Sequence, residues 1–394
     1  MSWRLLTSGE SHGRGLLVIV DGLPSGLAVS REDLSSVLER RRRGFGRGAR
    51  KNAERDELIV WGGIRNGRTT GAPVGISVGN AEWESWDGAM NPWMTDPADE
   101  NSRAVTSPRP GHADLPGGIK FGGADLRNIL ERASARTTAP RTLAGALASL
   151  VLKELGVSVR GAVDSIGGVT VNLPATEGEW EHAARSELGA AREEDEPALK
   201  ARITASGEEG TSIGGTFVVS VSGLPAGIGS FTEWDRRLDG RLAGALMAIP
   251  AIKGVEIGDG FRTADLTGKE VHDPIFAEGG RWSRGTNHAG GLEGGMSNGD
   301  EILIRAAMKP IPTMRKGLPS FDIKAGRVSE AHSERSDMCA VPSASVVAEA
   351  MTAWIIGCAV AEQFGSDRMD DLKERFGNYK QHCERWNLHE HMSS

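Results

Sequence analysis

The chain has 394 residues, of which 25% are charged, and a formal net charge of −7. This acidic balance argues against a general nucleic-acid-binding protein, since such domains are usually basic. Three cysteines are too few and too scattered for a disulfide framework or a zinc site, so we expect no metal. There is no signal-peptide pattern and no long uninterrupted apolar run, so we expect a cytoplasmic protein without a membrane span.

The first elements in chain order are a strand and a helix. The apolar run Leu16–Asp21 predicts a strand. Ser30 is a suitable N-cap for a helix that starts at Arg31 and is stopped by Gly44. Strand-like runs follow at 57–61 and 73–78. Residues 80–110 hold four prolines and show no clear periodicity, which predicts a long loop of the kind that often carries function.

The longest helix is predicted from about residue 125 to 155, with Pro140 either bending it or separating two helices. Further strands are predicted near 157–163, 169–171, 216–221, 254–257 and 302–308, and further helices at 177–202, 233–247 and 344–364. Residues 258–299 form a second glycine-rich loop region. Because helices and strands mix irregularly rather than alternating, the pattern favours an α+β fold.

The stretch "GESHG", residues 9–13, places Ser11 and His12 between glycines directly before the first predicted strand. A serine nucleophile activated by its neighbouring histidine is a poor interpretation. Such pairs usually join distant segments, and the G-x-S-x-G pattern is absent. A tight turn that carries polar side chains toward a ligand fits the stretch better.

The stretch "RRRRGFGRGAR" gathers arginines around the end of the first predicted helix. For Arg40 and Arg43, cations that complement the dipole at a helix C-terminus are an equally good explanation. Arg47 and Arg50 lie beyond the helix in a glycine-rich loop, where that explanation does not apply. Guanidinium groups match the geometry of phosphates and carboxylates, so this pair indicates a small polyanionic ligand.

Two further stretches carry groups suited to acid and anion chemistry. In "RPGHADLPG", a Pro-Gly turn holds Arg109 and His112, and an imidazole that titrates near neutrality suits general acid catalysis. In "ERASARTTAPR", Ser134, Arg136 and Arg141 stand near the start of a helix, where backbone N–H groups favour anions. A capped helix with solvated arginines explains the second stretch comparably well.

Two later stretches complete the set. "GGLEGGMSNGDEILIRAAMKPIPTM" leads through a strand into a rigid segment that begins at Lys309, and it lacks the P-loop pattern. "RSDMCAVPSASVVAEA" places Arg335 and Asp337 just before the last predicted helix. Many arginines, two loop histidines and a loop aspartate together indicate an enzyme that acts on a small phosphorylated acid.

The stretches "GESHGRGLLVIVDGLP", "ERASARTTAPRTLAG" and "RSDMCAVPSASVVAEA" resemble the three signature blocks of the chorismate synthase family. The similarity runs from about residue 3 to about residue 365, so we expect one domain over 1–394 with an extension from about 366. The resemblance implies a β-α-β sandwich, with helices packed between two antiparallel sheets, and assembly as a homotetramer.

The resemblance also implies an activity. That family converts 5-enolpyruvylshikimate 3-phosphate to chorismate by a 1,4-anti elimination, in which phosphate leaves C3 and a proton leaves C6. Reduced FMN is required although there is no net redox change, and its N5 accepts the proton or hydrogen. Some members also use NADPH to reduce their own flavin.

Site residues follow from the matching positions. The resemblance implies His12 as proton donor to the phosphate and His112 as donor to the flavin near N1, and these two assignments are interchangeable on sequence alone. Asp337, helped by Ser11 and Ser134, is implied as the relay that deprotonates flavin N5. The arginines implied around the substrate are Arg41, Arg47, Arg50, Arg136 and Arg335, of which Arg41 and Arg47 also match the NADP position. The implied flavin contacts are Arg132, Ala133, Ser134, Pro250, Ala251, Gly294, Lys309, Pro310, Ile311, Pro312, Thr313 and Arg335.

Three positions depart from the family pattern. Pro250, Pro312 and His288 stand where a polar amide, a serine and an arginine are usual, and the first two changes remove hydrogen-bonding groups near the implied flavin. We expect the loops at 80–110 and 258–299 to act as lids that exclude water. Two alternatives stay open: a non-catalytic, arginine-rich nucleic-acid-binding relative, and a phosphatase or simple lyase that works without flavin.

Overall fold

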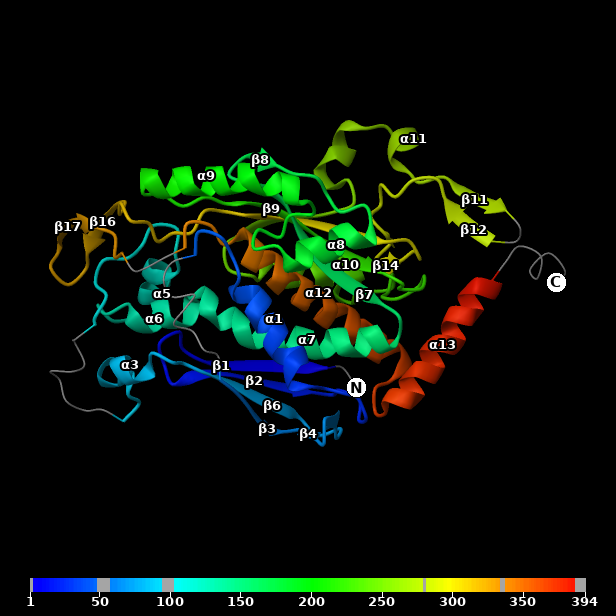
Figure 1. The fold of residues 1–394 in the computed structure, drawn as a ribbon, viewed down its shortest axis with the longest axis horizontal. Helices are drawn as coiled ribbons and strands as arrows, with labels where there is room; N and C mark the ends of the chain where they lie inside the picture. Colours follow the sequence, from blue (N-terminus) through cyan, green and yellow to red (C-terminus); the bar gives the residue numbers. More distant parts are fainter. Residues whose placement is uncertain (1–2, 48–56, 94–102, 279–280, 334–336, 387–394) are drawn as a thin grey trace.

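Two antiparallel sheets enclose a layer of helices (Figure 1). The computed structural model describes residues 3–47, 57–93, 103–278, 281–333 and 337–386. The first sheet has the order β1 (Arg4–Gly9), β2 (Gly15–Asp21), β6 (Val74–Gly79) and β3 (Leu58–Gly62). The second has the order β10 (Ile252–Ile257), β15 (Ile302–Met308), β9 (Gly215–Ser222), β7 (Ser158–Ile166) and β8 (Val169–Thr170). The α+β sandwich expected from the sequence is confirmed.

The helical layer consists of α1 (Arg31–Arg42), α7 (Thr138–Glu154) and α12 (Val341–Phe364), with α10 (Leu238–Met247) packed against α12 and β10. On the first sheet, Leu16, Val18 and Val20 of β2 are buried toward this layer, and the alternate residues Leu17 and Ile19 face outward. This alternation is the period-2 pattern of a strand with one buried face. It explains why the strand could be predicted.

The second sheet is covered on both sides. α12 contacts β7 and β9 on the inner face, and α8 (Glu177–Arg185) packs on β7 from the outside, where Trp180 joins Ala162 and Val218 in a small apolar cluster. α9 (Glu196–Glu209) lies on the same outer side (Figure 1). β9 is therefore buried over most of its length. The helix predicted over 177–202 is wrong as one peripheral element: it divides into α8 and α9 with a non-α-helical segment between them, and Leu188 and Leu199 are buried in the main core.

α1 begins and ends close to where the sequence predicts. The Ser30 hydroxyl accepts a hydrogen bond from the Asp33 N–H at 3.1 Å, and the Asp33 carboxylate accepts one from the Ser30 N–H at 2.8 Å. This reciprocal capping box satisfies two backbone donors at the start of the helix. The helix ends at Arg42, so Gly44 follows the C-cap as predicted.

The region predicted over 125–155 is divided, as one of the two alternatives allowed, but the division lies at Ser134 and not at Pro140. It divides into α6 (Arg127–Ala133), the short 3-10 turn η1 (Ala135–Thr137) and α7. Ser134 takes an extended conformation (φ −63°, ψ 143°) and its hydroxyl accepts from the Arg136 N–H, which starts a new helical segment. Pro140 lies in the first turn of α7, where a missing N–H removes no helical hydrogen bond.

α12 is the longest described helix, with 24 residues. It is long and apolar enough to cross a membrane, but 94% of its most apolar window is buried inside the protein, as for the central helix of a core. It packs most closely on α7 where Gly145 lies against Ala350. The two helices run side by side between the sheets (Figure 1).

The two long loops contain more structure than the sequence predicts. Residues 80–110 include α3 (Trp83–Met90), which has no buried residue and therefore lacks the core-facing stripe that marks most helices. Residues 258–299 contain η4 (Gly260–Asp265), α11 (Gly268–Val271) and the paired strands β11 (Ile275–Glu278), β12 (Arg281–Arg284), β13 (Leu292–Glu293) and β14 (Met296–Ser297).

The remaining described elements lie outside the two sheets and the central helical layer. They are β4 (Ile64–Arg65), β5 (Arg68–Thr69), α5 (Asp114–Phe121), η2 (Glu193–Asp195), η3 (Trp234–Arg236), β16 (Pro319–Asp322), β17 (Arg327–Glu330) and α13 (Met369–Arg385). α13 lies in the region predicted as a C-terminal extension, and its Met369, Leu372 and Phe376 join the main core. The boundary near residue 366 stays a prediction.

Candidate active site

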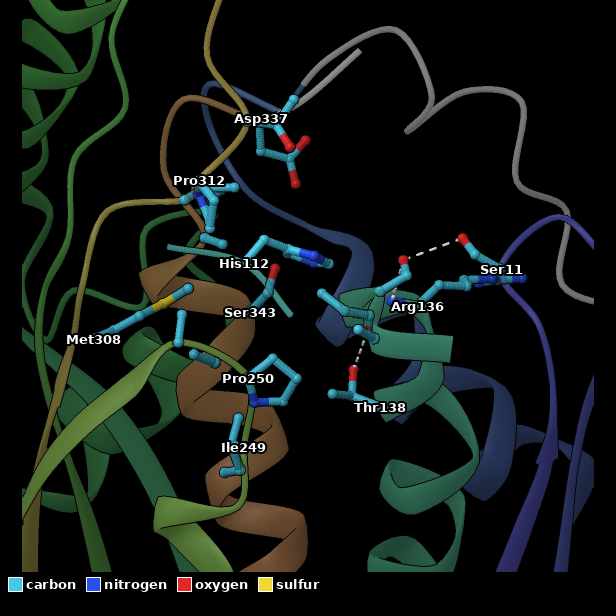
Figure 2. A pocket seen from close by; sticks show the side chains of 18 of the residues that line it. Ser11, His112, Arg136, Thr138, Ile249, Pro250, Met308, Pro312, Asp337 and Ser343 are labelled. Atoms are coloured by element: carbon cyan, nitrogen blue, oxygen red, sulfur yellow. Dashed lines mark hydrogen bonds between the residues drawn. The ribbon is translucent and has the colours of Figure 1, made fainter. Parts of the chain in front are cut away.

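A cavity of about 450 Å³ opens where α7 and α12 begin (Figure 2), a size typical of small-molecule sites. Among its described lining residues, five side chains are permanently cationic and only Asp337 is acidic. The five are Arg41, Arg47, Arg109, Arg136 and Lys309. His12 and His112 also line the cavity. This excess of positive charge favours a ligand that carries several negative charges.

The two central helices add to this positive field. Thr138 at the start of α7 and Ser343 in the first turn of α12 both line the cavity. Helix N-termini carry partial positive charge and unpaired backbone N–H groups, so they attract anions. The anion preference inferred from the arginines is thus reinforced by the backbone.

The turn between β1 and β2 brings Ser11 and His12 to the cavity. Gly9 has φ +98°, and an added Cβ would lie 2.2 Å from the Gly15 carbonyl oxygen, so only glycine fits where the hairpin closes. Ser134 donates a hydrogen bond to the Ser11 hydroxyl at 3.1 Å. The tight turn carrying polar side chains, as predicted from "GESHG", is confirmed, although the preceding strand β1 was not predicted.

His12 is held by a buried carboxylate of α6. Its ring Nδ1 lies 2.8 Å from Oε1 of Glu131, and its backbone N–H donates to Oε2 at 2.7 Å. Arg127, one helical turn earlier, donates to the same carboxylate at 3.1 Å. Burial acts to raise the pKa of the Glu131 carboxyl, but the hydrogen bonds and charge of His12 outweigh it and hold that pKa below its usual range.

The far side of the His12 ring is covered by α3. Trp86 stacks on His12, with the two ring centroids 3.9 Å apart. The Arg103 guanidinium in turn lies over the Trp86 ring, 3.8 Å from its centroid. The loop predicted at 80–110 therefore contributes an aromatic cover to the site. None of the described residues of 258–299 lines the cavity, so a lid role for that segment stays a prediction without structural support.

His112 is held in a similar way at the opposite side. Residues 109–112 form a β-turn, which is closed by a hydrogen bond from the His112 N–H to the Arg109 carbonyl. Gly111 has φ +77°, the positive value that a type II turn requires at this position. His112 Nδ1 lies 2.6 Å from Asp114, whose carboxylate also accepts two hydrogen bonds from the Arg109 side chain. Burial raises the pKa of the Asp114 carboxyl, while His112 and Arg109 together lower it far more.

The segment after β15 is tied to this turn. The Lys309 ammonium group donates a hydrogen bond to the Gly111 carbonyl. The Arg109 guanidinium donates one to the Thr313 hydroxyl at 3.0 Å. The Lys309 N–H donates to the carbonyl of Ala251, which is held in the left-handed region at φ +68°. A non-glycine residue there stores about 1–2 kcal/mol, and such strain is concentrated at functional sites.

The arginine cluster is divided between structure and cavity. Arg40 forms a bidentate pair with Glu349 of α12 at 2.7 and 2.9 Å, and Arg43 pairs with Glu39. Arg47 reaches back to two carbonyls at the end of α1, so helix-end binding does apply to Arg47, contrary to our expectation. These contacts, and the burial of Arg41, engage the described arginines of this cluster within the protein rather than presenting them as a basic surface for nucleic acid.

Asp337 and the serine pair lie on different sides of the cavity (Figure 2). Arg47 donates from Nε to Asp337 at 3.0 Å, whereas Ser11 and Ser134 contact each other. Arg50 and Arg335, two of the five arginines implied around the substrate, lie outside the described residues. Arg41, Arg47 and Arg136 line the cavity, as implied.

Most of the implied flavin contacts also gather here. Those that line the cavity are Ala133, Ser134, Pro250, Ala251, Lys309, Ile311, Pro312 and Thr313. Arg132 instead donates to Thr7 and Gly9 of β1, and neither it, Pro310 nor Gly294 is among the lining residues. Gly294 sits in the β13–β14 turn with open space around its Cα.

The cavity suits a flat ring that also has polar edges. One wall is apolar and includes Ile249, Pro250, Met308 and Val347. On that side the Ser343 hydroxyl is buried and has no hydrogen-bond partner among the described residues. Because buried polar groups are normally satisfied, this hydroxyl is available to a bound molecule. The residues present therefore fit a flavin ring beside a polyanion.

Three residues of the site were assigned no role from the sequence. Glu131 and Asp114 bind the histidines, and Trp86 covers one of them. Asp114 stands two positions from His112 and was visible as a neighbour, but Glu131 and Trp86 reach His12 only through the fold. His288 lies away from the cavity, where it contacts Asp259 at 2.8 Å.

Other chemistries find little support. No group of three His, Cys, Asp or Glu side chains among the residues with described positions could hold a metal ion. Burial raises the pKa of the Cys339 thiol to about 11, so this cysteine beside Asp337 stays protonated and is a poor nucleophile.

The fold and cavity together define a two-sheet α+β protein built around a site for a polyanionic ligand. The sequence model of the chorismate synthase family matches residues 3–361. The chorismate synthase of Moorella thermoacetica is 49% identical to the chain, in an alignment that covers 97% of the chain and 99% of the relative. The chorismate synthase of Brevibacillus brevis is 46% identical, and the alignment covers 97% of the chain and 100% of the relative. A solved structure described as a crystal structure of chorismate synthase matches with a TM-score of 0.79 and 38% identity, covering 98% and 99% of the two chains. The chain belongs to the chorismate synthase family.

Proposed function

We propose that the chain is a chorismate synthase, a lyase that eliminates phosphate from 5-enolpyruvylshikimate 3-phosphate to form chorismate on the route to aromatic amino acids. The observation that carries the proposal is the meeting of two histidines and five cationic side chains in one cavity of a chain that matches this family almost throughout. A phosphate leaving group and substrate carboxylates require such a charge distribution.

The cations would bind the substrate and stabilise its departing phosphate. Arg41, Arg47 and Arg136 line the cavity, and we propose them, with Arg50 and Arg335, as the groups around phosphate and carboxylates. As the C3–O bond breaks, negative charge grows on the phosphate, and preorganised cations lower the energy of that charge without reorganising. We assign His12 as the donor that protonates the leaving phosphate.

The second group of residues would serve the flavin. Reduced FMN, when bound, supplies the transient electron that lets the elimination proceed without net redox change. His112 would hold a proton near flavin N1, and the apolar wall with Lys309 to Thr313 would orient the ring and exclude water. Asp337, an acceptor held by Arg47, is proposed as the base that would take up the flavin proton on its side of the cavity. The Ser11–Ser134 pair lies across the cavity, and we propose that it would join this relay only with the ligands bound between the two sides.

An anaerobic assay tests the proposal. The protein is mixed with dithionite-reduced FMN and 5-enolpyruvylshikimate 3-phosphate, and the absorbance of chorismate is followed. We expect product only when flavin, substrate and protein are all present; formation of phosphate without chorismate would instead indicate a phosphatase. Replacing dithionite with NADPH tests the proposed second use of Arg41 and Arg47, since only a chain that reduces its own flavin sustains turnover.

We also propose a homotetramer, supported by the outer face of the first sheet. Leu6 of β1 pairs with Ile19 of β2, and Ile19 pairs with Gly75 of β6. Trp61 of β3 lies beside Gly75. The side chains of Leu6 and Trp61 are 67% and 71% exposed. These residues form an apolar row across all four strands. Such a continuous apolar patch is typical of a contact surface between subunits.

Ile19→Lys is expected to lower the mass of the assembly in solution, because it places a charge at the centre of this apolar row. Light scattering after size-exclusion chromatography gives the mass. Leu173→Lys is the matched control, since Leu173 is similarly exposed at 38% but lies outside this sheet. An unchanged mass for Ile19→Lys would show that this face is not an interface.

A further inference from the structure

We propose that Glu131 and Asp114 are positioning residues, each of which holds one cavity histidine with a proton on Nδ1 and with Nε2 presented to the ligand. Neither carboxylate is among the residues that line the cavity, so each would act through its histidine. The chemical role of the two Nε2 atoms rests on the proposed function, whereas the positioning itself is a property of the protein without ligands.

The two histidines are held by the same three-part arrangement on different elements. On one side, Arg127 donates to Glu131, and Glu131 lies 2.8 Å from His12 Nδ1. On the other, Arg109 donates to Asp114 at 2.8 Å, and Asp114 lies 2.6 Å from His112 Nδ1. Both carboxylates are completely buried.

The chemistry of the carboxylates determines the proton position. An ionised carboxylate only accepts hydrogen bonds, so the ring nitrogen that faces it must carry the hydrogen. Because their surroundings lower the pKa values of both carboxyls, each is ionised at neutral pH. Nδ1 is therefore assigned as the donor in both rings. In His112 the Asp114 contact at 2.6 Å is shorter than the 3.0 and 3.4 Å that separate the Arg109 guanidinium from Nδ1 and Nε2, so the carboxylate determines the proton position. Nε2 is then the nitrogen that serves the ligand, as in other carboxylate–histidine pairs.

The surrounding charges make these carboxylates necessary. Near the His12 ring the cations are Arg127 and Arg103. Near the His112 ring they are Arg109 and Lys309. The cavity lining adds Arg41, Arg47 and Arg136. Nearby cations disfavour a protonated imidazole. Among the described residues, Glu131 and Asp114 are the carboxylates that bond directly to these two histidines.

A purely structural role is the competing explanation, because a buried carboxylate that pairs with an arginine also stabilises the fold. The two explanations differ in what happens to the histidines. Loss of a structural ion pair lowers stability without regard to ring protonation. Loss of a positioning carboxylate changes the protonation of one histidine and leaves the other unchanged.

The test uses Glu131→Gln and Asp114→Asn in the full-length, ligand-free protein. Deuterium exchange at the C2 carbon of each histidine, followed against pH by mass spectrometry, gives one titration curve per histidine. We expect Glu131→Gln to move the His12 curve by about 1 pH unit or more toward lower pH and leave the His112 curve in place. Asp114→Asn should do the reverse, so each variant is the control for the other.

Activity gives an independent readout. In each variant the alkaline limb of the kcat–pH profile should move to lower pH, while KM changes less. If either variant does not fold, the other tests the same arrangement on its own histidine. Folded variants whose exchange curves match the parent protein would overturn the proposal. Selective shifts in a protein that makes no chorismate would uphold it and reject the proposed function instead.

Discussion

His112→Ala is expected to lower kcat by about 100- to 10,000-fold, the usual contribution of a general acid, and to change substrate affinity far less. The reason is geometric. His112 lines the cavity while its Nδ1 is engaged by Asp114, so the Nε2 edge of the ring, which Arg109 approaches at 3.4 Å, is the edge available to the ligand. The binding cations Arg41, Arg47 and Arg136 are untouched by the change.

Two controls separate the lost proton donor from lost structure. His112→Asn keeps an amide that can donate to Asp114, so it should preserve the turn but still lose turnover. His382→Ala removes an exposed histidine of α13 and should leave kcat unchanged. The measurement is steady-state chorismate formation with reduced FMN, together with equilibrium binding of the substrate. Normal turnover in His112→Ala would contradict its role as a proton donor.

Local patterns were sufficient to predict much of the fold. The alternation in β2 reports a sheet with one buried face, and the Ser30 capping box starts α1 where predicted. β1 was missed because Arg4, Leu6 and Ser8 face outward and its inner positions are only half-buried, so no apolar alternation is visible. α3 was missed because it buries no face of its own.

The broken helix shows a different limit. Helical periodicity continues from α6 into α7, and the residues at the break also tolerate helix. The break depends on Ser134, whose hydroxyl accepts from the Arg136 N–H and donates to Ser11 of a distant hairpin. The second contact joins residues 123 positions apart, so pattern reasoning along the chain could not have found it.

The same limit applies to the site. The arginines, His12 and His112 could be singled out because their residue types are chemically distinctive in glycine-rich loops. Glu131 could not, since a glutamate one turn after Arg127 normally indicates an exposed i,i+4 pair. Its burial and its contact with His12 arise only when the β1–β2 turn is laid against α6.

A second large effect is expected at the crossing of the two central helices. Gly145→Ala would place a Cβ 2.2 Å from the Ala350 backbone oxygen and 2.4 Å from its Cβ. Backbone atoms cannot rotate away, so α7 and α12 must separate. Overpacking of this kind destabilises by about 1–3 kcal/mol, and Gly145→Val should cost more because its branched side chain needs still more space.

Separation of these helices should also weaken ligand binding, because Thr138 of α7 and Ser343 of α12 flank the cavity (Figure 2). We therefore expect Gly145→Ala to lower the midpoint of thermal unfolding and to raise the substrate Kd together. Gly244→Ala is the matched control: it lies inside α10 with open space around it, so it should stabilise by about 0.5–1 kcal/mol. If Gly145→Ala lowered stability but left the Kd unchanged, the spacing of the helices would not control the cavity, and the site would depend on its loops alone.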